Sequence, residues 1–574
     1  MLRALVNYYE AQKARGQMPA EDWAVTKVSG AIELDESGKI LALYDLHETE
    51  VIQDKKGKEK KVTRSKLLQT PQIPVRTVNV VPGFLCDNTK YIFGFEKDKT
   101  KNFDKYFNAF KDLHLEMLSE INTPPAVALK NFLIHDENRR LTAEKKASLD
   151  TGNYVFRFKG KYLHEYPEMV QAWANKQTSR TKDVKGVCAL TGQEDLIVKT
   201  HPLIMGVPGA QSSGAALVSY NSPAFESYGK ENNLNAHIGR RASQKYTAAL
   251  NQLLKDQQAH TQLGETTIVY WAKNADPIYQ KAFAQAIDVQ SQEEDLELVD
   301  AIYKAIRDKK PIDIDGIEIG QEFYILGLSA NAARLFVRFF YEGTFGDLLT
   351  NLAAHNERMS IVKPKFIQED ILSPYQLLKA TANEKSRDKK ISPPLPGEVM
   401  TSIIQNSPYP ESLYSQVILR IRMDPANFDW KKAAIIKGYL IKNKNYGGLT
   451  MSLNENNHHK PYVLGRLFSV LEFLQQDAAD NSLNTTIKDK YFGSAAATPG
   501  RVFPLLIQNS ANHLKKIKSD TGKYIHYDRL IGQLIDQLDG EFSKTFSLEE
   551  QGEFYIGYYQ QRQRQFTKKD KENQ

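Results

Sequence analysis

The segment 209–229, GAQSSGAALVSYNSPAFESYG, gathers small and polar residues that could attack a bond, hold a phosphate or contact a polar partner. A nucleophile elbow requires Gly-x-Ser-x-Gly, and a phosphate-binding P-loop requires Gly-x4-Gly-Lys-Ser/Thr. Ser212 and Ser213 lack the first spacing, and Ala215 stands where the P-loop lysine would be. The spacing therefore argues against a serine hydrolase and against a P-loop nucleotide site.

The same segment is suited to binding. Its polar side chains are short hydrogen-bonding groups: Gln211, Ser212, Ser213 and Asn221. Amide side chains of this kind can form two hydrogen bonds with adenine. Ser222 followed by Pro223 predicts a helix start, whose free N–H groups favour a phosphate. A tight structural loop between a sheet and a helix is the alternative.

Three groups of cations could contact the phosphates of a nucleic acid. They are the tip of an expected hairpin, a pair that follows the polar segment, and a pair four residues apart: Lys55, Lys56 and Lys58; Arg240 and Arg241; Arg334 and Arg338. Clustered cations release condensed counterions from a nucleic-acid backbone. A solvated hairpin end is the alternative for the first group, and pairing with acidic residues of the same domain is the alternative for the third.

The sequence does not show the pattern of a metal or catalytic centre. His135-Asp136 is a pair of the type found in some metal phosphohydrolases, but further His and Asp ligands at helical spacing are missing. His458-His459 has no carboxylate companion nearby in the sequence. The two cysteines are too few for a zinc quartet. We therefore expect no metal, no cofactor and no catalytic residues.

Composition is that of a mildly basic globular protein. A chain of 574 residues predicts about three domains, and 41% hydrophobic with 25% charged residues excludes a fibrous or disordered protein. A net charge of +7 permits a nucleic-acid partner without requiring one. The first residues predict an amphipathic helix and not a signal peptide, and no apolar run of about 18 residues occurs. With only two cysteines, a cytoplasmic location is expected.

Alternating apolar and polar residues predict β-hairpins in the first half of the chain. One hairpin turns at 36–38, a second has the basic tip 54–58, and a third turns at 159–161. Apolar runs predict buried strands over 266–272 and 322–329.

The segment after the last of these strands is predicted to be a helix. Ser329 is expected to cap a helix over 330–345, because the apolar residues that follow recur at helical spacing. Arg334 and Arg338 lie at i and i+4 and would share one face of that helix.

Beyond residue 345, strand signals vanish and helical patterns dominate. A Lys-, Pro- and Ser-rich loop over 384–397 divides this half, and four helical patterns end the chain: 462–476, 500–517, 524–538 and 548–566. Ser547 and Glu550 form a capping box for the last of them. Short loops between long helices predict an antiparallel bundle.

The expected fold class is α+β: a mixed N-terminal region with β-hairpins and helices, followed by a C-terminal antiparallel helical bundle. Four regions are expected along the chain. They are an N-terminal α+β region, a central α+β region with the GAQSSGA loop, a helical connector and the bundle: 1–150, 151–345, 346–450 and 451–574.

Longer motifs point to a known family. They include the opening LRALVNYYE, FLCDNTKYIFG, CALTG, HPLIMGVPGAQSSGAALVSYNSPAFESYGKE, LNAHIGRRASQKYTAALNQLL, FYILGLSANAARLFVRFF and YVLGRLFSVLE. Together they run through most of the chain. The sequence resembles the large subunit of the type I-C CRISPR Cascade, a crRNA-guided surveillance complex of bacterial antiviral defence.

The resemblance implies a non-catalytic protein beside the crRNA 5′ handle and its processing subunit. Such a subunit recognises the protospacer-adjacent motif (PAM) on double-stranded DNA, helps open the duplex, stabilises the R-loop and supports recruitment of a helicase-nuclease, while the guide reads the remaining target. The implied partners are crRNA, target DNA, the displaced strand, the backbone subunits and the small subunit.

Several residues are candidates for reading the PAM in this setting. They lie in the N-terminal half and in the polar segment: Lys66, Arg76, Asn79, Asn88, Lys90, Gln211, Ser212, Ser213 and Asn221. Loss of a base contact should relax one PAM position, whereas loss of a phosphate contact should weaken binding to all sequences alike.

The C-terminal region resembles a small-subunit bundle, which in this family can also be made by internal translation initiation. Met451 lies in the Gly- and Asn-rich linker GGLTMSLNENN before that region and is the favoured internal start, with Met423 as its rival. An incidental linker methionine is the alternative.

A nuclease or other phosphodiesterase is the alternative function. It would require a carboxylate or histidine cluster, which the sequence does not reveal. A scaffold without nucleic-acid contact is a third possibility, and it would show no salt-dependent DNA binding.

Overall fold

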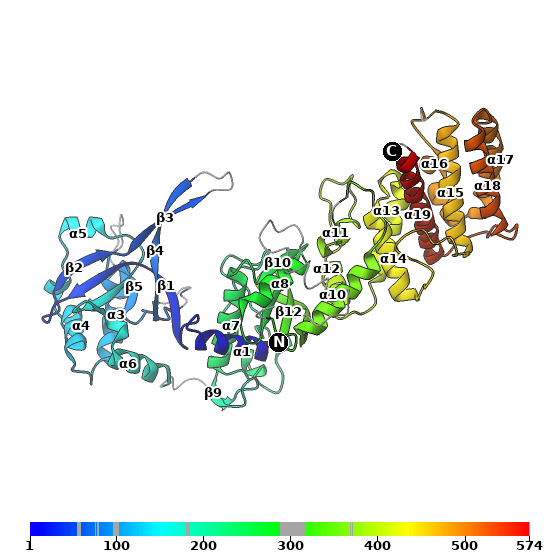
Figure 1. The fold of residues 1–574 in the computed structure, drawn as a ribbon. Coiled ribbons are helices and arrows are strands. Elements are labelled where there is room, and N and C mark those ends of the chain that lie inside the picture. The colour runs from blue at the N-terminus through cyan, green and yellow to red at the C-terminus, as the bar shows by residue number, and fades with distance from the viewer. Residues whose placement is uncertain are drawn as a thin grey trace. The chain divides into compact units, whose positions relative to one another are not determined.

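The computed structural model describes residues 1–53, 59–74, 76, 80–95, 103–178, 184–287, 317–367, 369, 371–480 and 482–572. The chain divides into two compact units, and Figure 1 labels their helices and strands. The N-terminal unit comprises residues 2–202 and 218–248, and the C-terminal unit comprises Met1, 203–217 and 249–574. The predicted division into four regions stays a prediction.

The N-terminal unit contains a mixed sheet and a separate two-stranded ribbon. Its strands are β1 (Trp23–Leu34), β2 (Ile40–Asp45), β3 (His47–Gln53), β4 (Glu59–Pro71), β5 (Cys86–Asn88), β6 (Asn153–Phe158), β7 (Lys161–Tyr162), β8 (Val184–Val187) and β9 (Glu194–Ile197). The main sheet has the order β3-β4-β1-β6-β5, with β2 paired to β1 and β7 paired to β6. Strands β8 and β9 form the ribbon. The three predicted hairpins are confirmed as β1–β2, β3–β4 and β6–β7.

The helices of this unit are α1 (Leu2–Ala14), α2 (Thr89–Ile92), α3 (Asp104–Met117), α4 (Pro124–Ile134), α5 (Ala143–Ser148) and α6 (Pro167–Thr178), followed by α7 (Arg240–Lys255), which runs into the C-terminal unit. Helices α2, α3, α4 and α6 share one apolar core with the sheet. Phe110 of α3, Phe132 of α4 and Phe156 of β6 are fully buried together, and the rings of Phe132 and Phe156 lie 5.4 Å apart. The aromatic residues therefore fasten the helices to the sheet.

The C-terminal unit begins with an antiparallel sheet in the order β10-β11-β12-β13. Its strands are β10 (His260–Leu263), β11 (Thr266–Ala272), β12 (Glu322–Asn331) and β13 (Arg334–Thr344). Tyr270 of β11 packs against Phe283 of α8 (Pro277–Ile287), with ring centroids 4.8 Å apart. The strands predicted over 266–272 and 322–329 are confirmed as β11 and β12.

The helix predicted over 330–345 is wrong. Residues Arg334–Thr344 form β13, and Ser329 lies inside β12, where it does not cap a helix. A tight turn through Ala332, whose φ is 52°, returns the chain so that β13 pairs with β12 along its whole length. The apolar spacing fitted a helix, but Phe-, Val- and Tyr-rich segments also favour strands, and β12 provides the hydrogen-bonding partner that decides between them.

Packed helices form the rest of the C-terminal unit, as the sequence predicts. They are α10 (Phe345–Met359), α11 (Pro374–Lys379), α12 (Leu395–Ile404), α13 (Glu411–Met423), α14 (Trp430–Lys444), α15 (Lys460–Asp477), α16 (Ile487–Ala497), α17 (Pro499–Lys516), α18 (Thr521–Asp536) and α19 (Leu548–Glu572). The described residues after Thr344 contain no strand. The mixed N-terminal part and the helical C-terminal part confirm the α+β class.

Three details of this helical region bear on the predictions. Each of the four predicted helical patterns is a helix, and α16 is an additional short one that the sequence patterns missed. The predicted capping box is confirmed, because Ser547 Oγ accepts from the Glu550 N–H (3.2 Å) and Glu550 Oε2 accepts from the Ser547 N–H (2.7 Å). Among the described residues, no helix has the length and apolar character needed to cross a bilayer.

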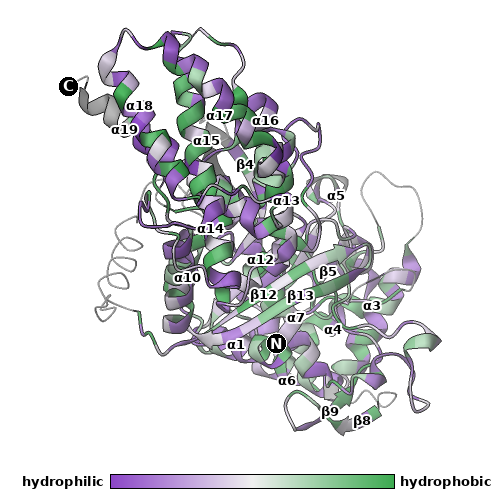
Figure 2. Cartoon of the chain, turned by 90° about the vertical axis from the view of Figure 1, so that its right-hand side faces the viewer, coloured by the Kyte–Doolittle hydropathy of each residue, from purple (hydrophilic) through white to green (hydrophobic). Residues whose placement is uncertain are grey.

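One apolar core continues through the helical region. It reaches from Leu263 to Tyr559 and includes almost the whole surface of α15, whose residues are coloured by hydropathy in Figure 2. Helices α15 and α19 cross in close contact, because Gly465 and Gly557 lie where the two backbones meet. A Cβ atom at Gly465 would lie only 2.0 Å from the Phe554 carbonyl oxygen. The crossing therefore depends on glycine at this position.

The buried residue His114 should make the free energy of unfolding depend on pH. His114 is fully buried, its Nδ1 donates to the Phe110 carbonyl (2.7 Å), and its Nε2 accepts from the Leu85 N–H (2.9 Å). Burial lowers the pKa of His114 to about 4, although the Phe110 hydrogen bond acts against this shift. The native state thus holds a neutral imidazole, and protonation of Nε2 would remove the hydrogen bond to Leu85.

The unfolded chain takes up this proton near pH 6.5, so the stabilisation is complete above that pH and declines as the pH falls toward 4. We expect this group alone to lower the free energy of unfolding by about 2 kcal/mol between pH 7 and pH 5. Urea unfolding of the wild type and of His114→Phe at both pH values measures the effect. The same pH dependence in both proteins would contradict it.

Candidate nucleic-acid interface

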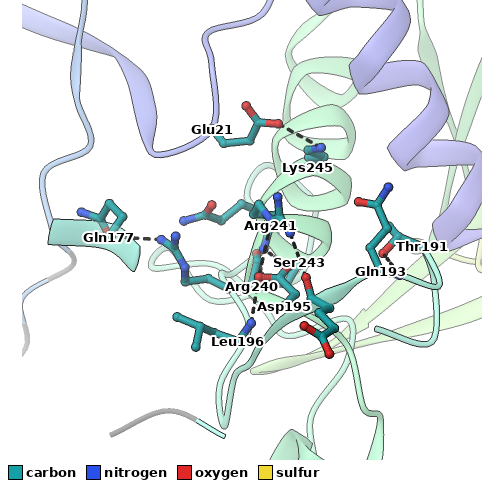
Figure 3. Close-up of polar contacts among 12 residues, drawn as sticks. Glu21, Gln177, Thr191, Gln193, Asp195, Leu196, Arg240, Arg241, Ser243 and Lys245 are labelled. Carbon is teal, nitrogen blue, oxygen red and sulfur yellow. Dashed lines mark hydrogen bonds and ion pairs between the residues drawn. The ribbon is translucent and has the colours of Figure 1, made fainter. Parts of the chain in front are cut away.

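The first turns of α7 bring together cations that the sequence analysis assigned to phosphate contact (Figure 3). Arg240 is 8% exposed, and its guanidinium donates to both carboxylate oxygens of Asp22 and to Gln177 Oε1 (3.1 Å). Its neighbour Arg241 is half exposed and pairs with Asp195, to which Nε lies 3.5 Å from Oδ1. Arg240 therefore has a clear structural role, while the phosphate contacts proposed for both arginines stay predictions.

One turn further along α7, Lys245 joins two more acidic residues of the same unit. Its Nζ lies 2.5 Å from Glu10 of α1 and 2.9 Å from Glu21. Burial would raise the pKa of Glu21, but hydrogen bonds from Lys13 and Lys245 hold that pKa at about 2. These contacts neutralise positive charge and fasten α1 and the start of β1 to α7.

The GAQSSGA loop is held in the C-terminal unit by backbone hydrogen bonds. Ile204 and Ala215 exchange two of them at 2.9 Å, which closes the loop at its base. Gly214 has a φ of 100°, and a Cβ there would lie 2.6 Å from Met205 Sδ. Glycine is therefore required at this point of the loop.

The far side of the loop rests on the turn between β12 and β13. The Gln211 N–H donates to the Ala332 carbonyl (3.2 Å), and Ala216 exchanges hydrogen bonds with Ala333 and Leu335 at 2.8 and 3.0 Å. Two backbone bridges, Ala210 with Ala332 and Ala216 with Arg334, run in parallel. The sheet thus supports the loop along both of its arms.

This support leaves the polar side chains of the loop exposed to solvent. Gln211, Ser212 and Ser213 are all exposed, and their side chains make no hydrogen bond to any residue that the structure describes. A rigid backbone carrying exposed short donors and acceptors is suited to contact with a polar partner.

The turn that supports the loop also carries the two predicted arginines. Arg334 is partly buried at the start of β13, beside Ala216. Arg338 is exposed at a bulge of β13, and its Nε donates to Ser329 Oγ (2.7 Å). The structure therefore brings Arg334 to the GAQSSGA loop, which sequence spacing alone did not show.

The second half of the polar segment belongs to the N-terminal unit and differs from the prediction. Asn221 is exposed, but Ser222-Pro223 does not start an α-helix. Residues Pro223–Phe225 form a single 3-10 turn, and the Ser222 side chain makes no capping hydrogen bond. The predicted helix start is thus only a three-residue 3-10 helix, because the chain leaves the helical conformation at Glu226, and a phosphate contact there stays a prediction.

Tyr228 is an exposed residue that the sequence analysis did not single out. Its side chain is 99% exposed, and its φ of 54° is unusual for a bulky residue. Asn235 Oδ1 accepts from the Ser227 N–H (2.9 Å), and its Nδ2 donates to the Lys230 carbonyl (2.5 Å). A fixed turn therefore presents one aromatic ring to solvent. Tyr-Gly within a polar segment was the only available signal for such a turn.

The described N-terminal candidates each make their own local contacts within the N-terminal unit. Lys66 on β4 pairs with Glu48 at 3.1 Å, and Lys90 of α2 lies 5.0 Å from the Tyr106 ring centroid. Asn88 is half buried, and its Oδ1 has no hydrogen-bond partner among the described residues. Asn79 and the hairpin-tip lysines Lys55, Lys56 and Lys58 lie outside the described residues.

Arg76 is the candidate with the strongest internal contacts. It forms two hydrogen bonds with the fully buried Asp87, at 2.9 and 2.5 Å, and its Nε donates to the Val81 carbonyl at 2.7 Å. Its guanidinium also lies 4.0 Å from the centroid of the Tyr91 ring. Burial raises the pKa of Asp87, and Arg76 acts against that rise. Arg76 therefore supplies the counter-charge of a buried carboxyl group.

The histidine pairs from the sequence belong to different units. His135 is exposed, with Glu137 3.9 Å away. His459 pairs with Glu553 of α19, a carboxylate companion that was not evident in the sequence, and this contact raises the pKa of His459. Within the described part of the chain, no group of three or more His, Cys, Asp or Glu residues is arranged to hold a metal ion.

Comparison with known proteins agrees with the family that the sequence motifs indicate. A family model described as CRISPR-associated protein (Cas_Csd1) matches residues 5–566. A comparison with curated proteins gave no match. Because the family match spans nearly the whole of both units, this chain belongs to the Cas_Csd1 family of CRISPR-associated proteins, the large subunit of the type I-C Cascade.

Proposed function

We propose that this chain recognises the PAM on double-stranded DNA in the cytoplasm as part of a crRNA-guided Cascade. In this role it helps open the duplex, stabilises the R-loop and supports recruitment of the helicase-nuclease. Its partners are crRNA, target DNA with its displaced strand, and the handle-processing, backbone and small subunits. The family is generally non-catalytic, and we propose the same for this chain.

The observation that carries this proposal is the exposed polar loop on its rigid support. Gln211, Ser212 and Ser213 have free side chains on a backbone that β12 and β13 hold in place, with Arg334 beside it. Amide and hydroxyl groups can read base edges, and arginine can contact a phosphate or guanine. Membership of the family supports a role in a crRNA-guided complex on DNA, and the loop carries side chains that can bind bases and phosphates.

Tyr228 adds a means of opening the duplex. A fully exposed ring on a turn held by Asn235 gains stability when it stacks on a partner, and every nucleobase offers a flat face. We propose that Tyr228 stacks on a base beside the PAM once that base is unpaired. Stacking of one base on an aromatic side chain is worth about 1–3 kcal/mol.

Tyr228→Ala should therefore slow or weaken opening about tenfold, while Tyr228→Phe, which keeps the ring, should behave like the wild type. Fluorescence of 2-aminopurine placed next to the PAM in a Cascade-bound duplex reports the opening. The stacking role is wrong if Tyr228→Ala opens the duplex as well as the wild type does.

We also propose that Met451 is an internal start that produces residues 451–574 separately. Met451 is 58% exposed in the linker between α14 and α15, and helices α15–α19 follow it. The shorter product would lack Phe428, which packs against Tyr555 and Tyr559 of α19 with ring centroids 5.8 and 5.9 Å apart. It would thus present an aromatic side of α19 to another subunit.

Met451→Leu should abolish the short product and leave the full-length chain intact, because this side chain is mostly exposed. An immunoblot against a C-terminal tag detects both forms, and Met423→Leu serves as the matched control. Persistence of the same short band in Met451→Leu, with its loss in Met423→Leu, would assign the start to Met423.

A further inference from the structure

A large polar pocket lies in the C-terminal unit between α15, α18 and α19. Its volume is about 590 Å³, and the linker before α15 closes one side of it. Three guanidinium groups line it: Arg466 of α15, Arg529 of α18 and Arg564 of α19. Two carboxylates, Glu455 and Asp536, are the acidic groups among its lining residues. Positive charge therefore exceeds negative charge in the pocket.

Arg466 is the unusual member of this group. It is 4% exposed, and its Nε donates to Gln561 Oε1 (3.2 Å), but it forms no ion pair with any described residue. Its Nη1 is buried without a hydrogen-bond acceptor among the described residues. Burial lowers the pKa of this guanidinium, while Tyr462 and the Glu455 carboxylate act against that shift, and an arginine keeps its charge in proteins. A buried guanidinium with no direct ion pair and an unbonded N–H group is costly, so the site is suited to an anion that enters from solvent.

The two other arginines of the pocket are more exposed than Arg466. Arg529 and Arg564 are both exposed, and Arg564 has only a distant ion pair with Glu455, at 3.6 Å. Guanidinium groups bind phosphate oxygens through two parallel hydrogen bonds. Three of them around one pocket form a site for a phosphate group.

The remaining lining is suited to a ligand larger than phosphate. Amide side chains project from two helices, Gln533 from α18 and Gln561 and Gln565 from α19. Leu530 and Leu534 of α18 add an apolar wall. Amides can bond the edge of a nucleobase, and an apolar wall can cover its face or its sugar.

We propose that this pocket binds one nucleotide, with its phosphate held by Arg466, Arg529 and Arg564 and its base placed among the glutamine amides. The nucleotide is either free in solution or one unit of a single strand. The single-strand source rests on the proposed contact with the displaced strand, whereas the free-nucleotide source is independent of it.

Calorimetric titration of the full chain with AMP, inorganic phosphate and a short oligothymidylate tests the proposal. The double variant Arg529→Ala/Arg564→Ala should lower the affinity for the nucleotide about tenfold or more, because each charged hydrogen bond is worth about 1.5–3 kcal/mol. Arg501→Ala is the matched control, since Arg501 is an exposed arginine of α17 that does not line the pocket.

Tight AMP binding that the double variant weakens would support the free nucleotide. Oligothymidylate binding with the same loss, but without AMP binding, would support a nucleotide within a strand. Arg466→Met should abolish binding in either case while the protein stays folded, because apolar replacement of a buried, unpaired charge is tolerated. The proposal is overturned if the wild type binds neither AMP nor oligothymidylate, or if the pocket variants bind them as tightly as Arg501→Ala does. It is also overturned if inorganic phosphate binds as tightly as the nucleotide ligand that binds.

PAM recognition can be measured separately on duplex DNA. A wild-type protein that recognises the PAM but binds no nucleotide would overturn this inference alone. A wild-type protein that binds a nucleotide in the pocket but recognises no PAM would overturn the proposed function alone.

Discussion

Gly465→Ala and Gly557→Ala are each expected to lower the free energy of unfolding of the C-terminal unit by about 3 kcal/mol. A Cβ atom at Gly465 would lie 2.0 Å from the Phe554 carbonyl oxygen, and one at Gly557 would lie 2.1 Å from the Tyr462 carbonyl oxygen. Both neighbours are backbone atoms, so a side-chain rotation cannot relieve the overlap. Helices α15 and α19 would have to separate and expose part of their shared core.

Gly532→Ala is the matched control for this prediction. Gly532 lies inside α18, and a Cβ there would meet no atom within 4 Å. Alanine favours a helix over glycine by about 1 kcal/mol, so this variant should be slightly more stable than the wild type. Urea unfolding followed by circular dichroism compares the three variants. Equal stability of Gly465→Ala and Gly532→Ala would show that the helices do not cross at the glycines.

Arg76→Ala is expected to destabilise the N-terminal unit by about 3–5 kcal/mol. Asp87 is fully buried, and its carboxylate receives hydrogen bonds from Arg76 and from the Gly83 N–H (2.7 Å). Without Arg76, this carboxylate would remain buried without its counter-charge. The loss should appear in the free protein, without DNA, as a lower midpoint of urea unfolding.

Two further variants separate this structural role from PAM reading. Lys66→Ala should barely change the unfolding midpoint, because the pair with Glu48 is exposed and screened by water. The double variant Arg76→Met/Asp87→Leu removes both charges and should recover most of the lost stability. If that folded double variant keeps full PAM discrimination, Arg76 does not read the PAM. If Arg76→Ala is as stable as the wild type, the structural role of Arg76 is wrong.

Local sequence patterns were sufficient where neighbouring residues determine the structure. The unbroken apolar run 266–272 is β11, and the capping box at Ser547 begins α19 as its side-chain chemistry requires. Local patterns gave the wrong structure where pairing with another segment determines the conformation. The segment Arg334–Thr344 has a spacing that fits a helix, but pairing with β12 makes it a strand. Helix α16 is short and contains few large apolar residues, so its periodicity was weak.

For the candidate site too, the sequence identified individual residues but not their partners in the tertiary structure. The sequence identified Arg240 and Arg76 as cations but not their carboxylate partners, and Asp22 lies more than 200 positions before Arg240. It identified the GAQSSGA loop by composition, whereas the support of that loop by the β12–β13 turn depends on tertiary structure. Exposure of Tyr228 likewise follows from a turn that Asn235 holds through its side chain.

The most direct test of the central claim is selection of DNA by the assembled Cascade from duplexes randomised beside the guide-matched sequence. Sequencing of the bound fraction should reveal enrichment of a short motif that requires this subunit. Gln211→Ala or Asn221→Ala should relax the motif at one position while overall affinity falls only about tenfold. The absence of any enriched motif, or the same motif from a complex without this chain, would contradict the claim.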